Sequence, residues 1–326
     1  MDIEIELISP IDNVCDYTFD FYWQNQRLDT ASVISHQSGT QFTYKDLVDA
    51  LRAGSDIHVK GDVGARFAYS LGVDLKHFGG GGNSEPAGCV FVDGNVGAEA
   101  GMGMVSGTLY VSGDVAQPFG NIIEVGSDVQ GYRKFRSITD ILCNGLYADM
   151  LVSNNFNENE RRLTLDDGIL RGTLGARCDH MATIIVEGDA YNGTGLLMRH
   201  GTIIIKGDGG MNTGAHLDGG TVAVFGSVGE FAGAYMKGGA LVFRDAKGYV
   251  GAKMEGGAIY SKRKVKTNPP AGKSRMKGND SALLRSLLDI GRVESMLYNK
   301  YEVEEEKERY ITVHMRDGSV LRRKVE

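Results

Sequence analysis

The chain has 326 residues, of which 42% are hydrophobic, 24% are charged and 46 are glycine, and its net charge is −7. The negative charge argues against a general nucleic-acid-binding protein. No stretch reaches the roughly 18 apolar residues of a membrane span, and the N-terminus lacks the basic-then-apolar order of a signal peptide. We therefore expect a soluble, cytoplasmic protein that binds neither nucleic acid nor membrane.

Residues 1–54 predict a small α/β cap. The segment IEIELI favours a strand, and TYKDLVDALRAG predicts a short helix that Thr43 caps, with Asp46 in its first turn and Gly54 at its end. We expect the lone Trp23 to pack within this cap. A cap of this kind would cover the open edge of a sheet that follows it.

A glycine-rich unit recurs from residue 56 onward, at first irregularly. DIHVKGDVGA at 56–65 matches CVFVDGNVGA at 89–98 with an offset of 33, which we interpret as one period plus an inserted excursion at 71–87. The next units begin 19 residues apart, at Gly88 and Gly107. IIEVGSD at 122–128 predicts one more strand. Residues 129–181 are interpreted as a second excursion, in which 131–163 leave the pattern before LDDGILRGTLGARC at 165–178 rejoins it.

Residues 182–260 repeat almost line for line. The units open with small residues spaced 19, 19, 19 and 18 apart, at Ala182, Gly201, Gly220, Gly239 and Gly257. About twenty residues cannot hold a strand, a helix and two loops, but they fit three short strands joined by tight turns. We therefore predict a right-handed parallel β-helix. Its corners, where a positive φ or close backbone approach is needed, are assigned to two sets of glycines, which are Gly188, Gly207 and Gly226, and Gly195, Gly214, Gly233 and Gly251.

Columns of residues one period apart test this register. Met198, Leu217, Met236 and Met254 form an apolar column that should face the interior. The next column alternates in charge: Arg199, Asp218, Lys237 and Glu255, as do Glu187 and Lys206 elsewhere. A ligand groove is one interpretation of the charged column, but we favour a surface ladder that rejects slipped registers, since exposed pairs contribute only about 0–1 kcal/mol each.

Two histidines belong to this repeat. His216 stands in column between Leu197 and Tyr235, so we interpret it as part of a ladder. His200 falls at a corner where later rungs have glycine, which makes it the more unusual of the two.

Residues 262–326 differ from the repeat. The basic segment 262–277 is interpreted as a linker or peripheral arm. A helix with Asp280 or Ser281 as its cap is predicted from the spacing of Leu283, Leu284, Leu287 and Leu288. RYITVHMRDGSVLRRKVE predicts a β-hairpin that turns at Asp317-Gly318. The predicted domains are thus a cap at 1–54, a β-helix at 55–261 and a linker, helix and hairpin at 262–326.

The sequence contains only incomplete matches to a nucleophile elbow and to a phosphate-binding loop. Ser70 lies in Ala68-Tyr69-Ser70-Leu71-Gly72, a relaxed nucleophile elbow with Asp74 and His77 nearby, which leaves an ester hydrolase as an alternative. Its context is not that of a strand leading into a helix, so we favour Ser70 as the start of the excursion loop. The run Gly79–Gly82 lacks the partners of a phosphate-binding loop and is interpreted as a hinge.

The four cysteines also give no complete site. Cys15, Cys89, Cys143 and Cys178 lie far apart without a CxxC pair, so we expect reduced thiols. Cys178, Asp179 and His180 could supply two metal ligands, but no second pair follows at a usable spacing. We assign no catalytic, cofactor-binding or metal-binding residue and expect no cofactor.

The units GDAYNGTGLLMRHGTIIIKGDGG, GSVGEFAGAYMKGG and YVGAKMEGG resemble the GXGXG repeat of two enzyme families. These are the glutamate synthase large subunit, in its C-terminal domain, and formylmethanofuran dehydrogenase, in the subunit that carries the repeat. The resemblance covers residues 56–260 and is strongest from 182. It implies a right-handed parallel β-helix that serves as a structural or subunit-contact element, while other domains or chains carry the amidotransferase, flavin, iron–sulfur or molybdopterin chemistry.

From these observations we expect a non-catalytic scaffolding subunit of a glutamate-synthase-like or formylmethanofuran-dehydrogenase-like redox complex. Its partners would be the other subunits, with homo-oligomerisation left open. The alternative is a stand-alone ester hydrolase that uses the Ser70 region.

Overall fold

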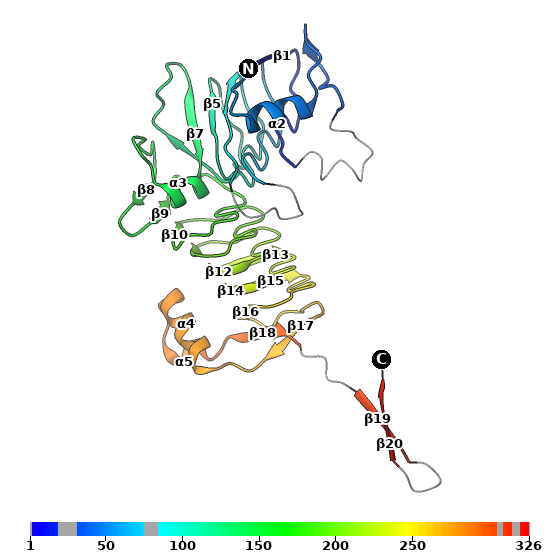
Figure 1. Cartoon of the computed structure of the whole chain (residues 1–326). Helices are drawn as coiled ribbons and strands as arrows, with labels where there is room; N and C mark the ends of the chain where they lie inside the picture. The colour runs from blue at the N-terminus through cyan, green and yellow to red at the C-terminus, as the bar shows by residue number, and fades with distance from the viewer. Residues whose placement is uncertain (1, 19–30, 75–83, 305–308, 315–319, 326) are drawn as a thin grey trace.

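The protein is a β-solenoid of about nine turns with few helices (Figure 1). The structure is a computed structural model that describes residues 2–18, 31–74, 84–304, 309–314 and 320–325. The predicted parallel β-helix is confirmed by the stacked parallel strands. Across these described ranges no helix is both long and apolar enough to cross a membrane.

One long side of the solenoid consists of two sheets. The seven-stranded sheet has the spatial order β2 (Gln37–Ser38), β1 (Ile3–Leu7), β3 (Ile57–Lys60), β4 (Cys89–Asp93), β5 (Thr108–Val111), β7 (Arg133–Ser137) and β6 (Ile122–Val125). The nine-stranded sheet has the order β17 (Ala271–Ser274), β18 (Asn299–Val303), β16 (Ala258–Ser261), β14 (Gly238–Phe243), β12 (Asp218–Val224), β11 (Thr202–Ile205), β10 (Thr183–Val186), β9 (Arg162–Leu165) and β8 (Asn155–Asn157).

Two smaller sheets and four helices complete the described part of the chain. The small sheets pair β13 (Ser227–Glu230) with β15 (Asp245–Gly248), and β19 (Arg309–His314) with β20 (Val320–Val325). The helices are α2 (Tyr44–Arg52), α3 (Ile138–Asn144), α4 (Gly278–Leu288) and α5 (Arg292–Ser295). The last pair of strands confirms the predicted C-terminal hairpin, while its Asp317-Gly318 turn lies outside the described residues.

The strand register reproduces the period of the sequence. Thr183 pairs with Thr202, and Thr202 with Thr221, so successive rungs are 19 residues apart. The offset of 33 is also confirmed, because Ile57 pairs in parallel with Val90. The excursion that accounts for this offset leaves the stack after Gly72, where the backbone N–H of Glu85 returns to donate to its carbonyl at 2.8 Å.

The interior column is buried, as predicted. Met198, Leu217, Met236 and Met254 are each at most 1% exposed and belong to one core cluster with the β-branched residues of the strands. Protein interiors are closely packed, so removal of one of these side chains would leave a void in the core.

The glycine corners have a shared backbone geometry. Left-handed residues alternate along each corner, as at Asn212, Gly214 and His216, whose φ values are 57°, 67° and 53°. The middle position is the predicted corner glycine throughout the regular repeat. In the other glycine set, close approach explains two members, because a Cβ on Gly207 or Gly226 would lie 2.1 Å from the Asp carboxylate of the previous rung. The prediction is wrong for Gly188, where a Cβ would meet no atom within 4 Å and φ is not positive.

The stack extends further toward the N-terminus than the sequence indicated. β1 pairs in parallel with β3, with Ile3 opposite Ile57, so it forms a first rung inside the segment 1–54 that was predicted as a cap. β2 and α2 then cover this end. Thr43 caps α2 as predicted and forms a capping box with Asp46 of the first turn, and Gly54 follows the helix with φ of 78°.

The C-terminal end is closed by the basic segment, which is not peripheral. Asn268 donates its backbone N–H to Val250, and Lys253 donates to Pro269, which satisfies backbone groups of the last rung. The helix cap was also predicted wrongly: Lys277 is the N-cap of α4, and Asp280 lies three residues later, where its carboxylate accepts the Lys277 N–H at 2.6 Å.

The solenoid is interrupted between β5 and β9. β7 runs antiparallel between β5 and β6, and β8 runs antiparallel to β9, so the parallel ladder stops on this side. On the glycine-rich side the stack continues, because Gly172 donates its N–H to Phe119 at 2.9 Å. We call residues 120–181 the break.

A buried ion pair holds the break together. Arg171, only 2% exposed, makes a bidentate pair with Asp167 at 2.7 and 2.6 Å and donates from Nε to the Ile122 carbonyl at 3.1 Å. Bidentate geometry of this kind suits a guanidinium that must be buried. The Arg171 side chain thus ties residues 167–171 to Ile122 of β6.

Candidate functional site

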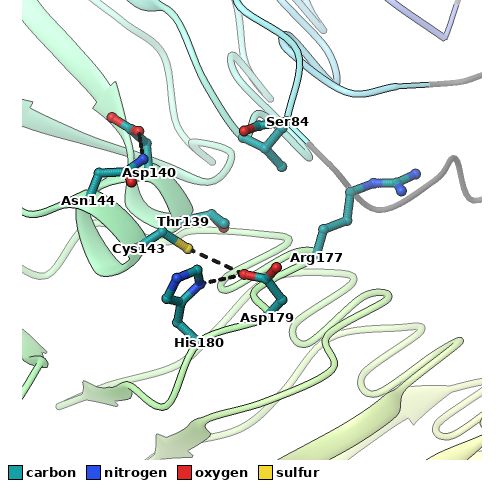
Figure 2. A pocket seen from close by; sticks show the side chains of 9 residues that line it. Ser84, Thr139, Asp140, Cys143, Asn144, Arg177, Asp179 and His180 are labelled. Atoms are coloured by element: carbon teal, nitrogen blue, oxygen red, sulfur yellow. Dashed lines mark hydrogen bonds and ion pairs between the residues drawn. The ribbon is translucent and has the colours of Figure 1, made fainter.

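A cavity of about 180 Å³ opens at the break, between α3 and the corner that rejoins the repeat (Figure 2). Its wall comes from four places in the sequence, which are Ser84 in the excursion, Val105 before β5, the region Thr139–Asn144 of α3, and Arg177, Asp179 and His180 of the corner. Across α3 lies a second, mainly polar hollow near Arg161 and Glu158. The first cavity contains the denser group of reactive side chains.

Helix α3 presents Cys143 to this cavity. Ser137 accepts the backbone N–H of Asp140 as the N-cap, and Thr139 anchors the helix to the solenoid by donating to the Ala176 carbonyl at 2.8 Å. Cys143 lies in the last turn, partly exposed, with its sulfur 3.8 Å from Oδ1 of Asp179. The helix therefore holds a thiol from the insertion against the edge of the repeat.

Asp179 and His180 come from the corner that restarts the repeat. The backbone N–H groups of Arg199 and His200 both donate to Cys178, so Asp179 and His180 stand one rung before Arg199 and His200. Asp179 thus begins the charged column, ahead of Arg199. Its carboxylate also hydrogen-bonds Nδ1 of His180. Figure 2 shows the Cys143, Asp179 and His180 side chains converging.

Cys178 supports this group from the interior side. It occupies the position of Met198 in the apolar column and is buried, with its sulfur 3.6 Å from the His180 carbonyl. The hydrogen bond between the two thiols raises the pKa of Cys143, to which burial adds, and lowers the pKa of Cys178. Neither sulfur is in a disulfide.

Arg177 supplies positive charge to the wall of the cavity. Burial, together with the neighbouring Arg199, lowers its pKa to about 10, so the guanidinium still carries its proton at neutral pH. The cavity therefore offers a thiol, a carboxylate, an imidazole and a cation.

The three converging side chains have the donor atoms of a transition-metal site. The ligand atoms of Cys143, Asp179 and His180 all lie within 4.8 Å of one another. The sequence had singled out Cys178, Asp179 and His180 for such a role, and the structure brings Asp179 and His180 to Cys143 instead. Cys143 was missed because it is 36 residues distant from Asp179, and no local spacing reports a contact across an insertion.

Ser70, the candidate nucleophile, lies within the stack. It is 7% exposed, has φ of 54°, and faces Gly103 of the next rung, where a Cβ would come within 2.9 Å of its hydroxyl. It therefore occupies a left-handed corner position just before the excursion. His77, the run Gly79–Gly82 and Trp23 lie outside the described residues.

The remaining candidates of the repeat are structural. Arg199 and Asp218 approach to 4.0 Å on the surface, as expected for a charged ladder. His216 stacks on Tyr235 with ring centroids 4.8 Å apart, which confirms its place in a ladder. His200 is exposed at its corner, whereas a Cβ on Gly219 of the next rung would lie 2.1 Å from the Arg199 carbonyl oxygen.

Comparison with known proteins gives a relative but no function. The sequence matches no family model. It is 47% identical over 201 residues to a protein of Methanothermobacter thermautotrophicus (strain Delta H) that is described as an uncharacterized protein. The match covers 61% of this chain and 64% of that relative, so the chain spans less than two thirds of the protein it resembles.

Proposed function

We propose that this chain is a non-catalytic structural subunit of a larger redox or amidotransferase assembly of the glutamate synthase or formylmethanofuran dehydrogenase type. The proposal rests on the resemblance of its corner repeats to the GXGXG repeat. The observation that carries it is the role of the recurring residues. Glycines serve the corners, the methionine column fills the core, and the charged column lies on the surface, where Arg199 and Asp218 approach to 4.0 Å. These roles are structural, so the repeat itself would contribute rigidity rather than chemistry.

Exposed apolar side chains outside the repeat support a contact role. Val293 and Leu297, on and just after α5, are 80% and 65% exposed, and Met296 beside them is also exposed. Tyr147, Met150 and Val152 are exposed after α3 in the break. Apolar patches on a protein surface mark sites of interaction. A subunit would cover such patches with its neighbours.

Purification from the native host tests this proposal. The chain should elute in a complex whose other subunits, identified by mass spectrometry, carry flavin, iron–sulfur, molybdopterin or amidotransferase sequences. The double substitution Val293→Asp with Leu297→Asp should release the chain if α5 contributes to the contact. Met211→Asp, at an exposed apolar residue of the repeat, is the matched control. Elution of the wild-type chain alone, or only with copies of itself, contradicts the proposal.

An esterase assay separates the alternative. The structural proposal predicts at most weak turnover of p-nitrophenyl esters by the purified chain, unchanged in Ser70→Ala. Strong wild-type turnover that Ser70→Ala abolishes would replace the structural proposal with the hydrolase.

A further inference from the structure

We propose that Cys143, Asp179 and His180 bind one divalent transition-metal ion, preferentially zinc, with a fourth coordination position facing the cavity. This site departs from the expectation, drawn from the sequence, that the chain has no metal-binding residue. It does not depend on the role of the chain as a subunit.

The spacing of the donor atoms fits a tetrahedral ion. Zinc bonds of about 2.0–2.3 Å place neighbouring ligand atoms roughly 3.3–3.7 Å apart. The sulfur of Cys143 and Oδ1 of Asp179 are 3.8 Å apart, and all three ligand atoms lie within 4.8 Å of one another. The ion would take the place of the proton between His180 and Asp179. Their side chains are 44% and 42% exposed, so they can rotate apart without disturbing the core.

The chemistry of the donors favours zinc over harder cations. A thiolate and an imidazole suit zinc, whereas magnesium and calcium prefer sites made of oxygen atoms. Three protein ligands with an open fourth position leave room for a water molecule, and the cavity of about 180 Å³ lies on that side. The adjacent Cys178 is buried and its thiol hydrogen-bonds the sulfur of Cys143, so it would orient the ligand sulfur.

The location distinguishes this group from the surface ladder of the repeat. In later rungs the corresponding residues are Arg199 and His200, then Asp218 and Gly219, and within the described ranges no insertion brings a thiol to them. At the break, a second segment of chain, α3, completes the set. Asp179 and His180, which occupy ordinary positions of two adjacent columns, thus gain a third ligand from the insertion.

Metal titration of the purified, reduced full chain tests the site. After removal of bound metal with a chelator, the wild type should bind one equivalent of Zn²⁺ in calorimetry. Cobalt(II) should give the absorption of a tetrahedral thiolate complex. Asp179→Asn and His180→Ala should each weaken binding at least about 10-fold, since even the loss of an outer partner costs roughly 10–100-fold. Cys143→Ser should in addition remove the sulfur-to-cobalt charge-transfer band.

Three controls match these variants residue for residue. Asp218→Asn and His200→Ala change the same residue types in the same columns, and Cys89→Ser removes a thiol from β4. All three should bind as the wild type does. Circular dichroism and the thermal midpoint verify that each variant is folded. If Cys143→Ser does not fold, the variants of the two exposed ligands, Asp179 and His180, decide the outcome. Absence of zinc binding by the wild type, or binding that survives removal of all three ligands, overturns the proposal.

Discussion

The regular repeat at 182–260 and the break at 120–181 obey different rules. In the repeat, each residue has counterparts at the same position of the neighbouring rungs, and one rung predicts the next. In the break, contacts join segments of different kinds, such as α3 with the corner at 177–180. The stability of the repeat therefore follows from its periodicity. The reactive side chains lie in the break, where the periodicity is lost.

The largest effect is expected where the break is clamped. Asp167→Asn should destabilise the protein by about 3–5 kcal/mol, because it leaves the Arg171 guanidinium buried without its counter-charge. Denaturant unfolding measures the change. The exposed Arg162–Glu160 pair is the control, and Glu160→Gln there should cost less than about 1 kcal/mol. An equal loss of unfolding free energy in the two variants would mean that the Asp167–Arg171 pair does not stabilise the break.

A core substitution in the repeat should come next. Met236→Ala removes a fully buried side chain from the apolar column, and neighbouring rungs are held too rigidly to fill the void, so we expect a loss of about 2–5 kcal/mol. Met211→Ala, at an exposed methionine of the same repeat, should change the thermal midpoint little. An unchanged midpoint for Met236→Ala would show that this column does not face the core.

Two carboxylates, Asp16 in the first rung and Asp167 in the break, should make the stability of the protein depend on pH in opposite directions. In the first rung, burial raises the pKa of Asp16 to about 6, despite hydrogen bonds from Thr18. The folded state therefore holds a proton that the unfolded chain releases near pH 4, and stability falls as pH rises from about 4 to 6, by on the order of 2–3 kcal/mol. Asp16→Asn should flatten this part of the stability curve.

Asp167 in the break should behave in the opposite sense. Burial opposes its ionisation, but the hydrogen bonds from Arg171 and Asn154 outweigh burial and lower the pKa of the carboxyl. Its contribution is present above the pKa of an unfolded aspartate, about 4, and is lost as pH falls through the lower folded value. Urea unfolding of the wild type, Asp16→Asn and Asp167→Asn from pH 3 to 7 separates the contributions of the two carboxylates. Contributions that change in the same direction with pH would contradict this prediction.

The smallest effect belongs to the surface ladder. Asp218→Lys should cost more than Asp218→Ala by a few tenths of a kcal/mol, because a lysine there faces Arg199 across the rung spacing. Added salt should narrow the difference by screening the repulsion. If Asp218→Lys and Asp218→Ala have the same stability at low salt, the alternation of charge along the column has no effect on stability.

The features that could be predicted from the sequence are mainly those that depend on the repeat. The register, the buried methionine column and the corner glycines follow from residues that recur at one spacing, and the helix α2 follows from its local cap at Thr43. The sequence did not predict that β1 joins the stack, since a single strand without its corner repeat carries no periodic signal. The ends of the solenoid are also non-repeating, so the role of Asn268 and Pro269 in closing it could not be inferred.

The candidate site shows the same limit. Asp179 and His180 were recognised as possible ligands, and continuing the charged column back by one rung would have placed them at the edge of the repeat. The position of Cys143 depends on how α3 folds back across the break, and neither composition nor spacing encodes that contact. Tertiary packing against a known repeat is therefore the missing information.

The metal site is the most specific claim, and anomalous scattering at the zinc absorption edge tests it most directly. In crystals of the zinc-loaded protein, we expect one peak bonded to Cys143, Asp179 and His180 at distances of about 2.0–2.3 Å, with no peak along the charged column at Asp218. A map without a peak between α3 and the corner at 177–180, or with zinc bound only within the regular repeat, would contradict the account.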